Sequence, residues 1–130
     1  MIVGVGLDMV ELERVDKLLA GSAGSRFAAR VLTEGERERS RVMSGRRLAE
    51  FVSGRFAAKE AVVKALGCGI GSAVGFQDIE VLPDSSGRPC CRLSPEAWER
   101  LGLKEELHRL HVAITHERSM ASATAIAERI

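Results

Sequence analysis

The chain has 130 residues, of which 45% are hydrophobic and 28% charged, a composition typical of one globular domain and not of a disordered tail or a fibre. Nineteen Lys and Arg against eighteen Asp and Glu give a formal net charge of +1, which leaves little global field to hold a polyanion such as duplex DNA. We therefore expect no nucleic-acid partner, and any anion site must be local.

The sequence contains no candidate membrane segment, because no run reaches the roughly 18 apolar residues that a spanning helix requires. The apolar start at Met1 also lacks a preceding basic region. We therefore expect a cytoplasmic protein with no membrane partner. The three cysteines, Cys68, Cys90 and Cys91, are odd in number and two of them are adjacent, which favours reduced thiols without a chemical role.

The first predicted element is a strand over residues 2–10, where apolar and small residues alternate. One face carries Val3, Val5, Leu7 and Met9, and the other carries Gly4, Gly6 and Asp8. Because glycine has no side chain, the second face is nearly bare. Bare strand faces favour close approach of another backbone or a ligand.

A helix is predicted over residues 11–19, ending near Gly21, with Val15, Leu18 and Leu19 directed inward and Arg14 outward. Thr33 and Glu36 have the spacing of a capping box, so a second helix should begin there. The dense charges over residues 36–41 are typical of a solvated helix face.

The third predicted helix is long, from about residue 47 to 66, and ends at the glycine-rich run over 67–71. A hairpin follows, with strands over 76–82 and 88–93 and a turn between them. Ser94 and Pro95 should open a short helix. Two strands over about 112–116 and 120–127 close the chain. The result is a single α+β domain with strands at both ends.

The long helix carries apolar side chains around most of its circumference but leaves one narrow polar window. Ser53, Ala57 and Lys64 fall within about 60° of Glu60 on a helical projection. The plain interpretation of Glu60 and Lys64, four residues apart, is an ordinary surface ion pair.

Asp8 poses a similar question, since a carboxylate near the end of an apolar strand must be solvated, paired or bound to a cation. Its plain interpretation is a cap for the helix that begins near Glu11. If Asp8 and Glu60 converge, two carboxylates beside a lysine would suit Mg²⁺, which keeps several waters and takes phosphate oxygens.

His116 ends an alternating strand, where its imidazole could bind a phosphate or move a proton, although a structural histidine is the commoner case. His108 and His111 lack ligand partners at metal-site spacing. The chain contains neither a nucleophile elbow nor a P-loop. These absences exclude the serine hydrolase and P-loop nucleotidase classes.

Several blocks of the sequence resemble the holo-acyl-carrier-protein synthase family of small 4′-phosphopantetheinyl transferases. The blocks are VGLDMVELER (5–14), GRFAAKEAVVKALG (54–67), FQDIEV (76–81), GRP (87–89) and VAITHE (112–117). They follow the family's order over nearly the whole chain, and the RFAAKEA block is highly specific. The resemblance implies a small α+β domain with an antiparallel sheet packed on a long central helix.

The resemblance also implies the reaction. Phosphopantetheine would pass from coenzyme A to a serine of apo-acyl carrier protein in fatty acid biosynthesis, leaving adenosine 3′,5′-bisphosphate. By similarity, Asp8 and Glu60 would hold Mg²⁺ at the pyrophosphate, Lys64 would add a positive charge, and Arg55 and His116 would contact the coenzyme A phosphates. Such phosphoryl transfer depends on charge stabilisation more than on a protein nucleophile. Three candidates for the base that takes the serine proton stay open. They are Glu117, His116 and a metal-bound water held by Glu60.

Two further expectations come from the family. Its members are homotrimers with active sites between subunits, and Arg14, Arg26 and Arg30 resemble the basic surface that receives the acidic carrier protein. For Arg26 and Arg30 the alternative is an ordinary solvated face. Two alternative functions are transfer onto a polyketide or peptide-synthetase carrier domain, and a coenzyme A-binding module without catalysis.

Overall fold

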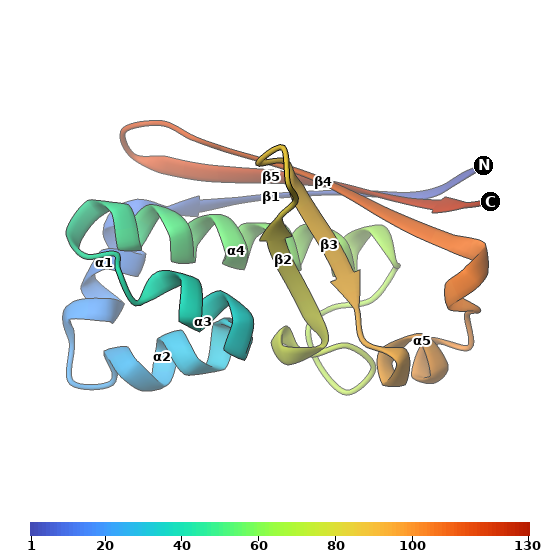
Figure 1. Cartoon of the computed structure of the whole chain (residues 1–130), viewed down its shortest axis with the longest axis horizontal. Coiled ribbons are helices and arrows are strands. Elements are labelled where there is room, and N and C mark those ends of the chain that lie inside the picture. Colours follow the sequence, from blue (N-terminus) through green and yellow to red (C-terminus); the bar gives the residue numbers. More distant parts are fainter.

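The computed structural model describes residues 1–130 and has two layers, a three-stranded antiparallel sheet and the helix that covers one of its faces. The sheet has the order β1 (Ile2–Glu11), β5 (Met120–Arg129), β4 (His108–His116). The long helix α4 (Gly45–Ala65) runs beneath it, as Figure 1 shows. The α+β architecture expected from the sequence is confirmed. None of the helices combines the length and apolar character that crossing a bilayer requires.

Strand β1 lies against α4 through its glycine face. A Cβ on Gly4 would stand 1.7 Å from the backbone oxygen of Ala65, and one on Gly6 would stand 1.8 Å from that of Ala61. No side chain fits at either distance, so only glycine allows this approach. The opposite face of β1 stays uncovered, with Val3, Val5, Leu7 and Met9 each 52–62% exposed.

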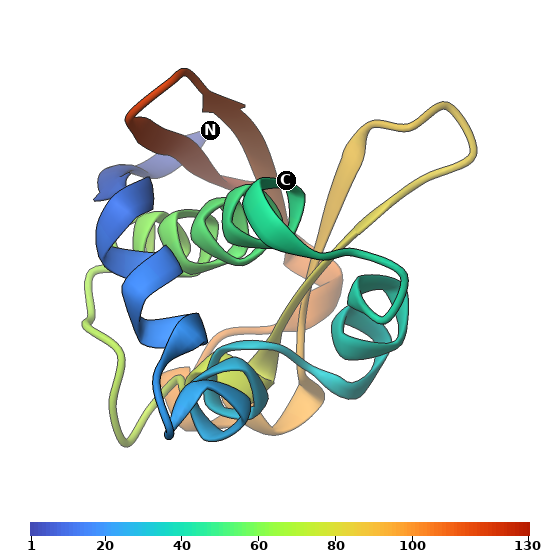
Figure 2. The same ribbon diagram turned by 90° about the vertical axis from the view of Figure 1, so that its left-hand side faces the viewer.

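Three short helices follow β1 and pack at one end of α4: α1 (Leu12–Ala20), α2 (Gly24–Val31) and α3 (Glu34–Ser40). Figure 2 views the molecule from this end. The expected capping box is present, since Thr33 Oγ1 accepts from Glu36 N and Glu36 Oε1 accepts from Thr33 N. No helix over residues 24–31 was predicted. Leu18 was expected to point inward, but it is 44% exposed because it lies at the rim of a pocket.

The charge run at α3 is not entirely a solvated face, because Glu36 and Lys59 are both fully buried and bonded to each other. Lys59 Nζ lies 2.7 Å from Glu36 Oε1 and also donates to the carbonyls of Val31 and Phe76. Glu36 Oε2 accepts from Val81 N. Every charge in this pair has its hydrogen bonds, which is the condition under which a buried ion pair is tolerated.

A second, two-stranded sheet crosses in front of α4 and is formed by β2 (Ile79–Pro83) and β3 (Pro89–Leu93). The strand predicted over 76–82 begins later than expected, because Phe76–Asp78 forms a 3₁₀ turn (η1), with Asp78 Oδ2 accepting from Gly75 N. Helix α5 (Pro95–Leu101) begins at the predicted Ser94 cap. A second 3₁₀ turn, η2 (Glu105–Leu107), leads into β4.

Candidate active site

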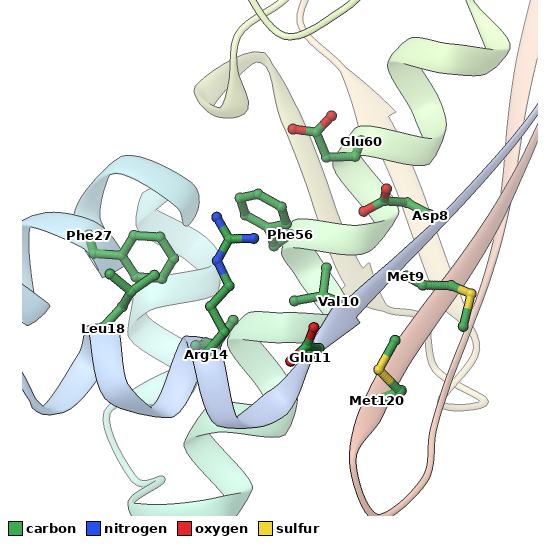
Figure 3. A pocket seen from close by; sticks show the side chains of 11 residues that line it. Asp8, Met9, Val10, Glu11, Arg14, Leu18, Phe27, Phe56, Glu60 and Met120 are labelled. Atoms are coloured by element: carbon green, nitrogen blue, oxygen red, sulfur yellow. The ribbon is translucent and has the colours of Figure 1, made fainter.

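A pocket of about 320 Å³ opens where β1, α1, α2 and α4 meet. Asp8 reaches it from β1 and Glu60 from α4, although 52 positions separate them in the chain. Figure 3 shows both carboxylates directed into this space, toward which the Arg14 guanidinium extends. The close contact between the glycine face of β1 and α4 produces this convergence, since Asp8 follows Gly6 on that same face.

Lys64 forms an ion pair with Asp8 and not with Glu60. Its Nζ lies 3.1 Å from Asp8 Oδ1 and 3.0 Å from the Leu7 carbonyl oxygen. The plain interpretation of Glu60 and Lys64 as an ordinary ion pair is therefore wrong. Of the predicted polar window, only Glu60 and Lys64 reach the surface, because Ser53 and Ala57 are fully buried under the neighbouring elements.

The environment of Glu60 disfavours its charge. Partial burial is the main reason that the pKa of Glu60 is raised, repulsion by Asp8 adds to the rise, and Lys64 opposes it. Two carboxylates that repel each other in a half-buried pocket are typical of a cation-binding site. No three His, Cys, Asp or Glu side chains are placed to hold one metal ion together, so protein ligands alone would not form a closed cage.

The pocket wall is apolar apart from its acids and Arg14. Phe27 and Phe56 face each other across it, with Arg14 between them in Figure 3. A second pocket of about 370 Å³ shares Phe27, Phe56 and Glu60 with the first and also includes Arg30. Arg26 and Arg30 are both exposed on α2, and Arg30 lines this second pocket together with Glu60.

Arg55 and His116 do not line the pocket of Asp8 and Glu60. Arg55 stacks on the Phe51 ring, 4.2 Å from its centroid, and its Nε donates to the Val81 carbonyl. Burial lowers the pKa of Arg55, Glu36 opposes this, and Arg39 adds to it. His116, at the end of β4, contacts Glu50 instead. Within one chain, the two expected phosphate ligands are therefore apart from the two acids.

The family described as the 4′-phosphopantetheinyl transferase superfamily matches residues 4–123. The chain belongs to this superfamily. A holo-acyl-carrier-protein synthase of Bacillus thuringiensis is 44% identical over 128 residues, which is 98% of this chain and 97% of the relative.

Solved structures of the superfamily have the same fold. A holo-acyl-carrier-protein synthase of Bacillus anthracis in complex with CoA (3′,5′-ADP) is 42% identical, covers 100% of this chain and 99% of its own, and gives a TM-score of 0.85. The enzyme of Neisseria meningitidis is 32% identical with the same TM-score, covering 99% of this chain and 100% of its own. The fold expected from the resemblance is thereby confirmed.

Sequence reasoning missed two residues beside this superfamily's sequence blocks, Arg46 and Glu50. Glu50 accepts from Arg46 at 3.2 Å and lies 3.3 Å from His116 Nδ1. The four-residue spacing of Arg46 and Glu50 was the available signal, but it predicts only a local helix pair. That Glu50 also meets His116 follows from the packing of β4 on α4.

The cysteines lie outside the site and are all free thiols, as predicted. Burial raises the pKa of Cys91 to about 12, and burial also raises the pKa of Cys68. Cys90 is exposed. Because the thiolate is the reactive form, roughly one Cys91 thiol in ten thousand is ionised at about pH 8. Brief iodoacetamide treatment at that pH should therefore modify Cys90 ahead of the half-buried Cys91, as measured by tandem mass spectrometry. Equal modification of both would contradict the raised pKa of Cys91.

Proposed function

We propose that this chain is a holo-acyl-carrier-protein synthase. It transfers 4′-phosphopantetheine from coenzyme A to a serine of apo-acyl carrier protein and releases adenosine 3′,5′-bisphosphate. The meeting of Asp8 and Glu60 in one pocket carries this proposal, because the chain has no candidate nucleophile there and phosphoryl transfer needs none. The reaction is the one that the names of its superfamily relatives describe.

Asp8 and Glu60 are the residues that would hold Mg²⁺. Their oxygens suit this hard cation, which would offset both the burial and the repulsion by Asp8 that raise the pKa of Glu60. When bound, Mg²⁺ supplies positive charge at the pyrophosphate, where negative charge grows as the bond breaks. Lys64 keeps Asp8 oriented through its 3.1 Å contact and adds a second positive charge.

Arg55 and His116 would bind the coenzyme A phosphates, with Arg55 suited to the 3′-phosphate. A guanidinium offers several N–H donors to a dianion, and only the Nε of Arg55 is used within the chain. Its stacking on Phe51 fixes the plane in which the remaining donors lie.

The direct test is mass spectrometry of apo-acyl carrier protein after incubation with coenzyme A, Mg²⁺ and this protein. Gain of one phosphopantetheine group on the carrier serine is expected. An unmodified carrier, with coenzyme A bound to the protein, would favour the binding module without catalysis. Competition between carriers would test the fatty acid role, since the fatty acid carrier should be modified ahead of a polyketide or peptide-synthetase domain.

The basic side chains of α1 and α2 would receive the carrier protein. Arg14 points into the pocket from α1. Arg26 and Arg30 are exposed on α2, and Arg30 lines the neighbouring pocket that also includes Glu60. An acidic carrier protein approaching this surface would bring its serine toward Asp8 and Glu60. Electrostatic docking of this kind acts mainly on association rate and salt sensitivity.

Arg14→Ala should raise the KM for carrier protein about fivefold and flatten its salt dependence, because one charge–charge contact of the docking surface is lost. The KM for coenzyme A should stay near wild type. Steady-state kinetics at several salt concentrations check this, with Arg109→Ala, an exposed arginine on β4, as the control. Equal weakening toward both substrates would contradict a docking role.

A homotrimer with sites between subunits would unite the separated halves of the site. The exposed apolar face of β1 (Val3, Val5, Leu7 and Met9) supports such an assembly, because adjacent apolar side chains on a monomer's surface mark an interface. Arg55 and His116 of one copy could then serve the Asp8 and Glu60 of another.

A mixing experiment tests the shared site. Glu60→Gln and Arg55→Ala proteins should each be nearly inactive, but subunit exchange between them should restore about a quarter of wild-type activity, because that fraction of interfaces then has both halves intact. Light scattering should report a trimer throughout. Absence of any recovery after verified exchange would place the complete site within one chain.

A further inference from the structure

The Glu50 carboxylate, at the edge of α4, lies between the His116 imidazole and the Arg46 guanidinium. Its Oε2 lies 3.3 Å from His116 Nδ1 and 3.2 Å from Arg46 Nε. The Glu50 side chain is only 23% exposed, whereas the His116 side chain is 48% exposed. The carboxylate is therefore the less exposed partner, and the imidazole is the more accessible one.

Arg46 holds the chain that follows His116. Its Nη2 donates to the carbonyls of Glu117, at 3.1 Å, and Arg118, at 2.7 Å. The β4–β5 turn is thus tied to the start of α4 by the same arginine that binds Glu50. Residues of α4 therefore contact both the His116 ring and the carbonyls of the two residues that follow it.

We propose that Glu50 is the positioning residue that sets the orientation and tautomer of His116 for coenzyme A binding, an inference that rests on the proposed function. An ionised carboxylate only accepts hydrogen bonds, so the ring nitrogen facing it must carry the proton. With Nδ1 facing the Glu50 carboxylate at 3.3 Å, Nε2 is the nitrogen left for the donor substrate. A neutral ring accepts a proton there, and a protonated ring donates to a phosphate oxygen.

The chain provides a matched control in His111 of β4 and Glu128 of β5, the other carboxylate–imidazole contact of the molecule. There Nε2 of His111 lies 3.0 Å from Glu128 Oε1, and the carboxylate is more exposed, at 38%. Removing Glu128 takes a carboxylate away from another histidine of β4 and leaves the contact between Glu50 and His116 in place.

The kinetic test compares Glu50→Ala, Glu50→Gln and Glu128→Ala. Glu50→Ala should raise the KM for coenzyme A about tenfold, as loss of an outer partner typically does, with a smaller effect on kcat. Glu50→Gln should recover part of the loss, because its amide oxygen can still accept from Nδ1. Glu128→Ala should match wild type. In a His116→Ala background, Glu50→Ala should cause no further loss, whereas an additive loss would overturn the inference.

A spectroscopic test does not depend on activity. Long-range ¹H–¹⁵N correlation spectra of the neutral rings should show His116 with its proton on Nδ1, and Glu50→Ala should move the ring toward the other tautomer. Glu128→Ala should leave the His116 signals in place. A wild-type His116 protonated on Nε2 would overturn the inference while transferase activity stands. An inactive wild-type protein with the expected His116 signals would instead overturn the proposed function.

Discussion

Glu60→Gln is expected to lower kcat for phosphopantetheine transfer by about 100-fold or more, because it removes one negative charge from the pair proposed to hold Mg²⁺. Glutamine keeps the volume and one oxygen acceptor of glutamate. The binding of carrier protein should therefore change little. Mass-spectrometric rates at increasing Mg²⁺ concentration measure the effect, and near-normal turnover at saturating Mg²⁺ would contradict the role of Glu60.

The same substitution should not destabilise the metal-free fold. Because the folded-state pKa of Glu60 is raised, its ionised form is less favourable in the folded protein than in the unfolded chain. This penalty is present at neutral pH and disappears as the pH falls through the raised pKa. A neutral glutamine removes it, so the Tm of Glu60→Gln without metal should equal or exceed that of wild type near pH 7.

Calorimetry with and without Mg²⁺ separates the two effects. Mg²⁺ should raise the Tm of wild type more than that of Glu60→Gln, since a ligand stabilises the state that binds it. Glu99→Gln, an exposed glutamate on α5, is the matched control and should behave as wild type in both assays. A lowered Tm of metal-free Glu60→Gln would mean that Glu60 has a structural role.

Gly6→Ala is expected to lower the free energy of unfolding by about 3 kcal/mol, because the new methyl group forces rigid backbones apart. Its Cβ would stand 1.8 Å from the Ala61 carbonyl oxygen, so β1 and α4 must separate. Asp8 lies on β1 and Glu60 on α4, and transfer activity should fall with the displacement. Chemical denaturation and transfer assays measure the two losses.

Gly69→Ala is the control for this prediction. Its Cβ would meet nothing within 4 Å, and its backbone does not adopt a positive φ. Stability and activity should therefore stay near wild type. A Gly6→Ala protein of normal stability would show that the approach of β1 to α4 is not required.

Some features of the structure could be predicted from residue patterns, and others could not. The alternation over residues 2–10 predicted both the strand and its bare face, and the spacing of Thr33 and Glu36 predicted a capping box that the structure confirms. The burial of the Glu36 side chain could not be predicted in the same way. Glu36 has the neighbours of a surface residue in sequence, and its buried charge is paired with Lys59, which α4 contributes.

Local patterns determined the elements of this protein, because capping, periodicity and glycine placement act between residues a few positions apart. The sequence blocks also indicated the family. Only the tertiary structure decided which charged side chains meet. Lys64 pairs with Asp8 and not with Glu60, and Glu50 reaches His116 across 66 positions. Such contacts depend on how β1 and β4 pack on α4, and no helix or strand period encodes that packing.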